Sequence, residues 1–417
     1  MSERVPEGWY ETELHQFVDV SRGYAFKSSD YRASGNPIVR VTNINNSNGL
    51  DLTDNVVFLD ESRTKEFESY LLKNDDFLLV MVGATVGKYA EINTKGRLLF
   101  LNQNMWRLSV HDDRTNSQRF AIYGLQKVVE EFLGTMQGSA REFLTQKDFG
   151  KAPVLLPPLS EQKKIASILT SVDELIEKTQ LQINKLQDLK KATMNELLTI
   201  GIGHTEFKDS ELGRIPKSWE VTDLRMIGTF AKGKGISKND IISRGIPCIR
   251  YAEIYTEHNF VIKSFKSFIS PETVNTTKKL KTNDIIFAGS GETVEDIGKS
   301  VAFIFDYDAY VGGDSIIFSP NVHSNSIFLS YQLNDDLRRI QLRKLGQGSS
   351  VIHVYATGIM QLKIALPPLS EQNKIVDILL SYTESINKLK QKLSQTQSLK
   401  KSLMQDLLTG KVRVTAN

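Results

Sequence analysis

The stretch LPPLSEQ occupies residues 156–162, and the same seven letters return at residues 366–372. Each copy leads into a long run without glycine or proline, which ends only at Gly201 in the first half and Gly410 in the second. Ser160 is a suitable N-cap, and Glu161 stands in the first turn, where the helix dipole favours a negative charge. Lys163 occupies the place where a full capping box needs Glu or Gln. The motif therefore predicts the start of a long helix, written twice.

Apolar residues recur at helical spacing through both runs, in a stripe wider than a strict heptad seam. The stripe also takes in Leu175, Leu189 and Leu399. A lone helix of this length would leave the stripe in water, so we expect the two helices to bury their stripes against each other. Apolar residues left over would offer a surface to partner subunits. The residues we expect at this helix–helix and partner interface are Ile165, Leu169, Val172, Ile176, Ile183, Leu186, Ile375, Leu379, Tyr382, Ile386, Leu389 and Leu393.

The offset of 210 residues extends well beyond LPPLSEQ, which identifies an internal duplication. Pro6 and Trp9 return as Pro216 and Trp219, and the sequence Gln-Gly-Ser at 137–139 returns at 347–349. Between these matches the halves differ freely. We therefore divide the chain into a variable head (1–157), a helix (158–200), a second variable head (201–367), and a second helix with a tail (368–417).

Each head mixes short β-like runs with turns, and each has a late helical stretch, at 117–133 and 326–345. The β-like runs carry alternating β-branched and aromatic residues bounded by Gly, Asn and Asp. The predicted fold class is α+β: two globular domains, each with a curved mixed or antiparallel sheet and helices, separated by two long antiparallel coiled-coil helices with a pseudo-two-fold internal repeat. The β-like runs are NPIVRVTNI, DDFLLVMVGATVGKY and RLLFLNQNMWRLSV in the first head, and IPCIRYAEI, NDIIFAGSGETV, KSVAFIFD and DSIIFSP in the second.

The composition is that of a soluble globular protein, with 40% apolar and 24% charged residues. The net charge of +3 permits an anionic partner without requiring one. A single cysteine, Cys248, excludes an internal disulfide and a cysteine-cluster zinc site. We find no apolar signal region at the N-terminus and no stretch of about 20 apolar residues. We therefore expect a cytoplasmic protein that does not enter a membrane.

Motifs for catalysis are weak. The segment at 289–300 ends in Gly-Lys-Ser like a nucleotide-binding loop, but Thr293 stands where the motif needs glycine, and the repeat aligns Gly83–Lys88 with the same region. The segment Asn-Pro-Ile-Val at 36–39 lacks the second proline and the aromatic residue of the amino-methyltransferase tetrapeptide. The six histidines show no metal-binding spacing. We therefore predict no catalytic residue and no metal or cofactor bound by this chain.

The heads do offer loop side chains suited to bases and phosphates. Arg can bridge guanine, Asn or Gln can bridge adenine, and Glu or Asp can accept from cytosine. For any single residue, ordinary turn chemistry is the competing interpretation. The predicted DNA-binding residues of the first head are Lys27, Arg40, Thr42, Asn43, Thr85, Lys88, Asn102, Gln103, Asn104, Gln137, Ser139 and Arg141. Those of the second head are Lys232, Lys234, Arg250, Glu253, Ser290, Thr293, Lys299, Asp314, Gln347, Ser349 and His353.

Taken together, these features resemble the specificity (S) subunits of type I restriction–modification systems. The resemblance covers essentially the whole chain and includes Pro-x-x-Trp at each start, the Gln-Gly-Ser loops, the doubled LPPLSEQ and the bridging segment 207–219. It implies that each head is a target recognition domain reading one half of a split, asymmetric DNA sequence. It implies that the helices pack antiparallel, set the gap between the half-sites and dock two methyltransferase (M) subunits, with restriction (R) subunits joining the complex.

In that family the S subunit is not catalytic. S-adenosylmethionine belongs to the M subunits, which methylate adenine N6, and ATP and magnesium belong to the R subunits. Two alternatives remain open from the residues alone: a coiled-coil scaffold with protein-binding heads, and a nucleotide-binding enzyme that uses Lys299.

Overall fold

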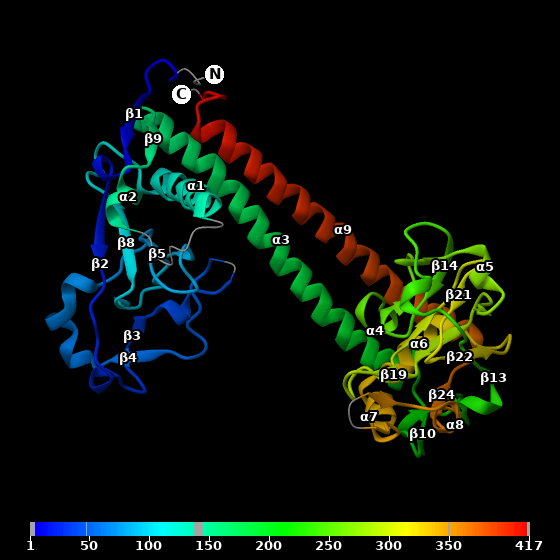
Figure 1. Cartoon of the computed structure of the whole chain (residues 1–417). Helices are drawn as coiled ribbons and strands as arrows, with labels where there is room; N and C mark the ends of the chain where they lie inside the picture. The colour runs from blue at the N-terminus through cyan, green and yellow to red at the C-terminus, as the bar shows by residue number, and fades with distance from the viewer. Residues whose placement is uncertain (1–4, 47, 137–144, 349–350, 415–417) are drawn as a thin grey trace. The chain divides into compact units, whose positions relative to one another are not determined.

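The computed structural model describes residues 5–46, 48–136, 145–348 and 351–414. Two compact units emerge from the contacts between residues, and Figure 1 labels their helices and strands. Unit 1 comprises residues 1–180 and 391–417, and unit 2 comprises residues 181–390. Each long helix contributes residues to both units. The predicted four-part division of the chain into heads and helices therefore follows sequence order, while the compact units each combine a head with half of each helix.

The two long helices are α3 (Leu159–Thr199) and α9 (Leu369–Leu408), as predicted from the two runs. At a rise of 1.5 Å per residue, the 41 residues of α3 measure about 62 Å. One detail of the prediction is wrong: Ser160 is not the N-cap, because the helix already begins at Leu159. The carbonyl oxygen of Pro158 instead accepts the first amide hydrogen bonds, from Glu161 and Gln162.

The helices are antiparallel, and each unit shows this by itself. In unit 1 the start of α3 shares an apolar cluster with the end of α9, where Ile165 and Leu169 join Leu407 and Leu408. In unit 2 the end of α3 shares a cluster with the start of α9. The predicted interface residues Ile165, Leu169, Ile183, Ile375, Leu379 and Ile386 are buried, and Val172, Ile176, Leu186, Tyr382, Leu389 and Leu393 are half-buried.

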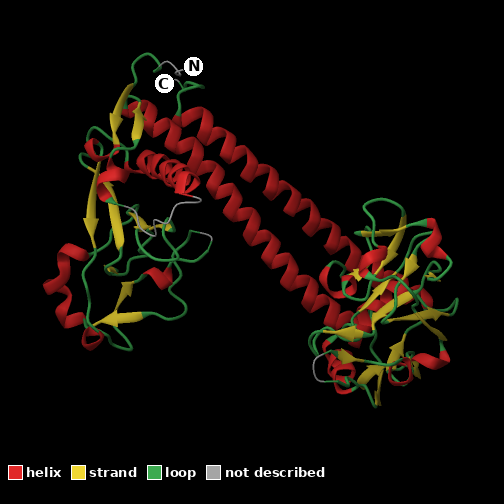
Figure 2. Cartoon of the chain, in the orientation of Figure 1, coloured by secondary structure: helices red, strands yellow, loops and turns green. Residues whose placement is uncertain are grey.

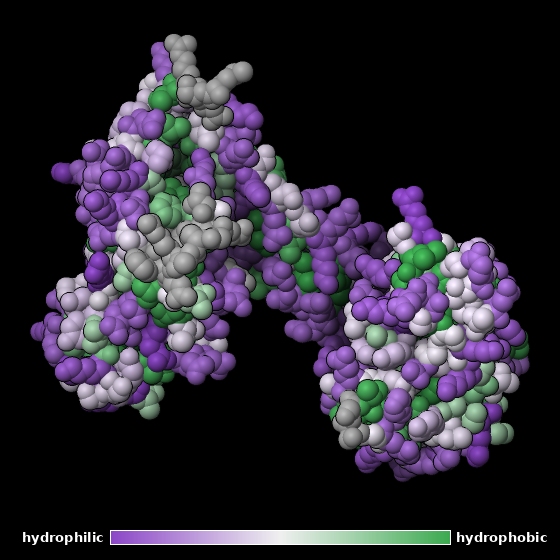
Figure 3. Space-filling model, in the orientation of Figure 1, coloured by the Kyte–Doolittle hydropathy of each residue, from purple (hydrophilic) through white to green (hydrophobic). Residues whose placement is uncertain are grey.

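Three leucines of the predicted stripe remain in solvent. Leu175, Leu189 and Leu399 are 41%, 49% and 52% exposed, and Leu181, also on α3, is exposed as well. Figure 3 shows the apolar residues that reach the surface between the hydrophilic ones. The apolar stripe is therefore wider than the face that the two helices cover for each other.

The head of unit 1 contains two small sheets besides the antiparallel pair β1-β9, and Figure 2 draws the strands as arrows. The first has the strand order β2-β8-β5-β6 and is antiparallel, and the second has the order β4-β3-β7 with a parallel pair between β3 and β7. Helix α1 packs against β8. The elements are β1 (Tyr10–Glu13), β2 (Val18–Arg22), β3 (Asn36–Val39), β4 (Val57–Leu59), β5 (Phe77–Val80), β6 (Tyr89–Glu91), β7 (Phe100–Leu101), β8 (Met105–Val110), α1 (Gln118–Met136), α2 (Gln146–Gly150) and β9 (Pro153–Leu156).

The head of unit 2 repeats this plan with additions. Its two larger sheets have the orders β13-β22-β18-β20-β15 and β16-β14-β21-β17, so β15 and β17 are added to the corresponding sheets of unit 1, and the pairs β10-β11, β12-β24 and β19-β23 stand beside them. The strands are β10 (Phe207–Ser210), β11 (Gly213–Pro216), β12 (Glu220–Asp223), β13 (Gly228–Lys232), β14 (Ile246–Ile249), β15 (Phe260–Val261), β16 (Ser267–Ile269), β17 (Lys278–Lys279), β18 (Ile285–Ala288), β19 (Ser290–Gly291), β20 (Ser300–Ala302), β21 (Tyr310–Val311), β22 (Ser315–Pro320), β23 (Ile352–His353) and β24 (Lys363–Leu366). The short helices are α4 (Glu253–Thr256), α5 (Pro271–Val274), α6 (Ser326–Leu333), α7 (Asp336–Lys344) and α8 (Ala356–Ile359).

Three sequence predictions differ from these elements. The run IPCIRYAEI stops as a strand at Ile249 and continues into α4, and the run NPIVRVTNI stops at Val39 and turns into a 3-10 helix. The late stretch at 326–345 is two helices, because Asp335 accepts the amide hydrogen of Arg338 and so begins α7 as a new N-cap. The predicted α+β class with mixed and antiparallel sheets is confirmed.

The repeated motif fastens each head to a helix start. Trp9 Nε1 donates to Glu161 Oε2 at 3.0 Å in unit 1, and Trp219 Nε1 donates to Glu371 Oε2 at 3.1 Å in unit 2. The neighbouring glutamine is buried in both copies, and its amide bridges a proline carbonyl and a backbone N–H of the head. Gln162 Nε2 donates to Pro157 at 2.9 Å, and Gln372 Nε2 donates to Pro367 at 2.8 Å.

The segment that follows the other long helix in sequence completes each fastening. In unit 1, Arg413, which follows α9, donates to both oxygens of Glu161, each at 2.9 Å. In unit 2, His204, which follows α3, lies 2.8 Å from Glu371. Hence the glutamate of LPPLSEQ, which is buried in unit 1 and half-buried in unit 2, joins the head, its own helix start and the segment after the other helix.

Candidate nucleic-acid interface

Both heads make the same backbone crossing between their two sheets. Gly23 lies so close to Asn102 that a Cβ atom would come within 1.9 Å of the carbonyl oxygen, and Gly233 meets Gly312 in the same way at 2.0 Å. The two pairs are related by the 210-residue offset. Only glycine allows this approach, because any side chain would overlap the opposing backbone. The crossing places the following turn at the same point of each head.

The turn that follows carries the residues predicted to read bases. In unit 1 it is Asn102-Gln103-Asn104, between β7 and β8, and in unit 2 it is 312–314, between β21 and β22. Asn104 and Asp314 both have a left-handed backbone, with φ of 71° and 57°. Asn and Asp adopt this conformation more readily than most residues. The predicted equivalence of the two turns is thus visible in their geometry.

The side chains at these turns differ between the units. Gln103 and Asn104 are exposed in unit 1, whereas Asn102 is buried and accepts the amide hydrogen of Gln103 at 2.7 Å. Unit 2 has two glycines and one exposed carboxylate, Asp314, in place of these amides. Unit 1 therefore presents amides that can donate and accept, and unit 2 presents an acceptor beside bare backbone.

In unit 2 several predicted residues gather around one hollow of about 340 Å³. Lys232, Ser290, Asp314 and His353 line this hollow together with Tyr355. Ser290 Oγ and His353 Nδ1 are 2.8 Å apart, which fixes the orientation of the imidazole ring. The hollow has a cation, an anion and an exposed aromatic ring at its edge, a combination that suits nucleic-acid bases and phosphates.

A second hollow of about 570 Å³ adjoins the first at Asp314. Its lining includes Arg250, Tyr251 and Lys238. Asp314 lines both hollows, so Arg250 and Lys232 belong to one continuous surface of unit 2. Tyr355, Tyr251 and Lys238 were missed from the sequence, because nothing in their local pattern distinguishes them from ordinary loop residues.

Some predicted residues serve the fold instead. Glu253 is buried and accepts hydrogen bonds from Arg250 and Ser267, and Asn43 is buried and accepts the amide hydrogen of Arg40. The Arg40 side chain donates to the carbonyl of Asn55 and lies 5.7 Å from the ring of Tyr31. These contacts hold loops in place, and they leave the side chains of Glu253 and Asn43 without access to a base.

The remaining predicted residues are not among those that line the two hollows of unit 2. In unit 1, Lys27 and Thr42 are exposed, Thr85 is half-buried, and Lys88 Nζ donates to Asn46 at 2.6 Å. In unit 2, Lys234 and Gln347 are exposed. Gln137, Ser139, Arg141 and Ser349 lie outside the described residues.

The loop at 289–300 has no free backbone donors for a phosphate at its Gly-Lys-Ser end. The Gly298 N–H donates to Ala288, the Lys299 N–H to Asp296, and the Ser300 N–H to Asn334. The Lys299 ammonium group lies 3.2 Å from Asp296, and the Thr293 hydroxyl donates to the same carboxylate. The side chains therefore close a turn, and the geometry does not support nucleotide binding here.

Among the described residues there is no group of three or more His, Cys, Asp and Glu side chains placed to hold a metal ion. Within the same residues, no helix is both long and apolar enough to cross a membrane.

Comparison with known proteins gives a family and a fold. A family model for the type I restriction modification DNA specificity domain matches residues 6–187 and again residues 216–396. The MjaVIII specificity subunit of Methanocaldococcus jannaschii is 27% identical over 99% of this chain and 94% of its own length. The EcoBI specificity subunit of Escherichia coli is 22% identical over 98% of this chain and 87% of its own length.

Solved structures share the fold at low sequence identity. The crystal structure of the type I restriction–modification S subunit from M. genitalium superposes with a TM-score of 0.59 at 14% identity, over 100% of this chain and 98% of the other. A chain from a study of complex assembly and conformational transition of the type I system superposes with a TM-score of 0.58 at 13% identity, over 98% of this chain and 100% of the other.

Proposed function

The chain belongs to the type I restriction modification DNA specificity family, and we propose that it selects the DNA sequence on which a type I restriction–modification complex acts. It reads double-stranded DNA and has no catalytic residue of its own. The observation that carries the proposal is the pair of equivalent turns at 102–104 and 312–314: the backbone is shared and the exposed side chains differ. Two copies of one scaffold with unlike contact residues suit a target made of two unlike half-sites.

Unit 1 reads one half-site with Gln103 and Asn104, whose amides can form paired hydrogen bonds with adenine. Unit 2 reads the other with Asp314, Arg250 and Lys232, which surround the two adjoining hollows. Lysine and arginine neutralise backbone phosphates, and the acceptor Asp314 suits the amino group of cytosine. The net charge of +3 is modest for this task, so partner subunits supply part of the phosphate contacts.

The helix pair α3 and α9 sets the gap between the half-sites and docks two methyltransferase subunits. The exposed residues Leu175, Leu181, Leu189 and Leu399 support this part of the proposal, because each leaves apolar area on the long helices that the rest of the chain does not cover. The methyltransferase subunits would bring S-adenosylmethionine, and restriction subunits would bring ATP and magnesium. This assembly works in the cytoplasm, where the host DNA lies.

The test is a map of methylated adenines in the DNA of a host that carries this chain and its methyltransferase partner. Replacing Gln103-Asn104 by Gly-Asp, the residues of unit 2, is expected to change one half-site and leave the other half-site and the gap unchanged. The reciprocal change, Gly313→Gln with Asp314→Asn, is expected to change only the other half-site. Changes in both half-sites from either variant, or in neither from both variants, would contradict the proposal.

A further inference from the structure

Two lysines that the repeat makes equivalent occupy very different surroundings. Lys190 lies on α3 and Lys400 on α9, separated by the offset of 210 residues. Both ammonium groups lie over aromatic rings. Lys400 Nζ is 5.5 Å from the ring of Tyr123, and Lys190 Nζ is 5.6 Å from the rings of both Phe260 and Tyr331. Each unit thus packs its lysine side chain against aromatic rings in the same way.

The counter-ion is not shared. In unit 1, Lys400 pairs with Asp173 at 2.7 Å, and Asp173 also accepts the hydroxyl hydrogen of Tyr123 at 2.8 Å. The residue equivalent to Asp173 in unit 2 is Thr383, and Lys190 Nζ donates to its hydroxyl oxygen at 2.8 Å. A hydroxyl group satisfies one hydrogen bond but does not neutralise the ammonium charge.

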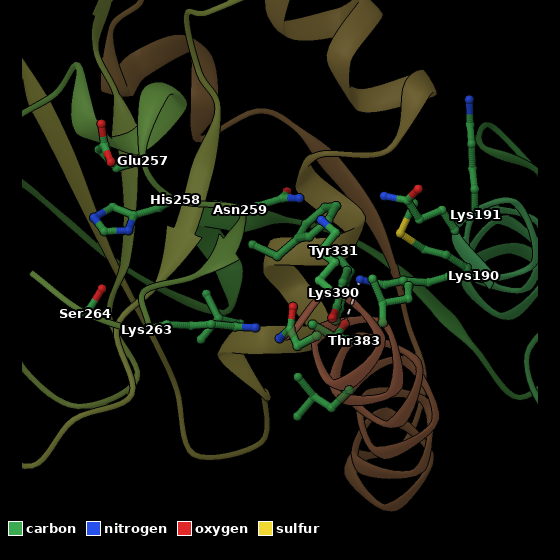
Figure 4. Close-up of a pocket in the computed structure, with 17 residues that line it drawn as sticks. Lys190, Lys191, Glu257, His258, Asn259, Lys263, Ser264, Tyr331, Thr383 and Lys390 are labelled. Atoms are coloured by element: carbon green, nitrogen blue, oxygen red, sulfur yellow. Dashed lines mark hydrogen bonds between the residues drawn. The ribbon is translucent and has the colours of Figure 1, made fainter. Parts of the chain in front are cut away.

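More positive charge gathers around Lys190. Lys191, Lys263 and Lys390 line the same cavity, which has a volume of about 480 Å³. Figure 4 shows Lys190, Lys263 and Lys390 entering from three different segments around Tyr331 and Thr383. Position 180, equivalent to Lys390, is a neutral glutamine. At these two pairs of equivalent positions, unit 2 has one negative charge fewer and one positive charge more than unit 1.

The carboxylates of the chain offset only a small part of this charge. In the part of the chain that the structure describes, none of these four lysines forms an ion pair, and one carboxylate, Glu257, lines the cavity. Burial lowers the pKa of Lys190, and the charge of Lys263 lowers it further. An ammonium group that is half-buried among like charges is stabilised when an anion enters.

The remaining lining and the volume of the cavity are those of a ligand-binding pocket. Phe260, Tyr331, Leu380 and Ile386 form an apolar and aromatic part of the lining. Phe260 has φ of 61°, a strained conformation for an aromatic residue that is typical of ligand-binding segments. The volume lies within the range of about 300–1,000 Å³ in which small-molecule and cofactor sites fall.

We propose that this cavity binds a phosphorylated small molecule of nucleotide size, with its phosphate groups between Lys190, Lys263 and Lys390, in the position that Asp173 fills in unit 1. One carboxylate would neutralise only one of these lysines and fill little of the cavity. A ligand with several negative charges fits both the number of lysines and the volume. The aromatic and apolar lining contacts the organic part of the ligand. The site is separate from the residues proposed to read DNA.

Isothermal titration of the full chain with inorganic phosphate, pyrophosphate and ADP tests the proposal. We expect pyrophosphate and ADP to bind with one site per chain and inorganic phosphate to bind more weakly. Tighter binding of ADP than of pyrophosphate would identify a nucleoside as the organic part, and equal binding would assign recognition to the phosphates alone. Absence of binding by all three probes would overturn the proposal.

The decisive variant is Thr383→Asp, which restores to unit 2 the carboxylate of unit 1. It is expected to pair with Lys190, keep the fold intact and weaken pyrophosphate and ADP binding by about tenfold or more, because an ion pair replaces the ligand. The double variant Lys263→Ala with Lys390→Ala, at exposed positions, is expected to weaken binding similarly. Lys388→Ala is the matched control, since Lys388 already pairs with Glu384 at 2.7 Å.

Unchanged binding in Thr383→Asp, or equal loss in Lys388→Ala, would overturn the site. A binding measurement with duplex DNA tells whether the cavity is part of a nucleic-acid surface or a small-molecule site. If Thr383→Asp weakened duplex binding by the chain while pyrophosphate and ADP bound to neither protein, the cavity would belong to the DNA interface and the proposal would be wrong. The half-site methylation map reports on the DNA-reading turns and does not depend on this result.

Discussion

The two helix starts and the two turns at 102–104 and 312–314 come from the same duplication, but they have diverged to very different degrees. LPPLSEQ is identical in both halves, and its Trp–Glu hydrogen bonds are 3.0 and 3.1 Å long. The turns at 102–104 and 312–314 share no residue type at any of their three positions. At the helix starts the glutamate and glutamine side chains are bonded to fixed partners in the head, whereas Gln103, Asn104 and Asp314 of the turns are exposed to solvent.

The lysine pair occupies an intermediate position in this comparison. Lys190 and Lys400 keep their type and their aromatic contacts, while the partner changes from Asp173 to Thr383. The aromatic contact of a half-buried lysine can therefore be conserved while the charge of its hydrogen-bond partner changes. Comparing the halves of one chain thus distinguishes positions held by packing from positions free to take a new ligand.

The largest expected effect comes from the buried tryptophans of the two fastenings. Trp9→Ala and Trp219→Ala should each lower the free energy of unfolding of their unit by about 3–5 kcal/mol, because each removes a large buried ring and leaves a glutamate without its donor. Urea unfolding followed by circular dichroism measures the loss. A loss below about 1 kcal/mol in either variant would mean that the shared motif does not fasten the head.

The two close backbone crossings should respond alike and more weakly. Gly23→Ala and Gly233→Ala bring a methyl group against a carbonyl oxygen, so each should cost about 1–3 kcal/mol through forced backbone shifts. Gly124→Ala is the control, since Gly124 lies within α1 with open space around it and should gain about 0.5–1 kcal/mol. Thermal unfolding midpoints rank the three variants. Similar midpoints for all three would contradict the crossing.

The stability that the Glu161 hydrogen bonds give to unit 1 should depend on pH. Burial raises the pKa of Glu161, but hydrogen bonds from Arg413 and Trp9 outweigh burial and leave the pKa below 4.5. The folded state therefore favours the charged carboxylate, and the resulting stability is full above about pH 4.5 and falls as the pH drops through the folded-state pKa.

Glu161→Gln removes this contribution. It should lower the free energy of unfolding by about 1–3 kcal/mol at pH 7, because the Arg413 guanidinium loses a charged partner. The gap between the variant and the unchanged protein should narrow as the pH falls below 4.5, the unshifted value for a glutamate carboxyl. Urea titrations at a series of pH values measure the gap. If the difference in free energy of unfolding grew as the pH fell, the pKa of Glu161 would be raised in the folded state rather than lowered.

The smallest effect on stability is expected at the exposed turns. Gln103→Ala and Asp314→Ala should each change the free energy of unfolding by less than about 0.5 kcal/mol, since both side chains lie in solvent. Their effect should appear in DNA selection, where discrimination against a wrong base should fall by about 1–3 kcal/mol for each base that the variant no longer hydrogen-bonds. Competition between matched and altered half-site duplexes measures it, in the presence of the methyltransferase partner.

The sequence predicted the elements that depend on local pattern. The repeat, the bounds of α3 and α9 to within a residue or two, and the α+β heads all follow from periodicity and glycine placement. Local pattern failed at two helix starts. The Asp335 side chain begins a new helix within the late stretch of unit 2, and the backbone carbonyl of Pro158 accepts the first amide hydrogen bonds of α3, so that helix begins before Ser160.

For the candidate site, the sequence named Lys232, Ser290, Asp314 and His353, but it could not tell that they share one hollow, because they come from four separate segments of the chain. It also placed Glu253 and Asn43 among the DNA-binding residues, although both are buried and bonded inside the head. Exposure of a polar loop residue is set by what packs over it, and no local pattern records that.

The sequence by itself determined that this protein is a duplicated module with two long helices, because periodicity and repeated motifs are properties of the chain order. Only the tertiary structure decided which groups meet. Arg413 reaches Glu161 across 252 positions, and Lys190 finds a hydroxyl group where Lys400 finds a carboxylate. Hydrogen bonds and charges act over a few ångströms in space, so their partners are set by the folded path of the backbone.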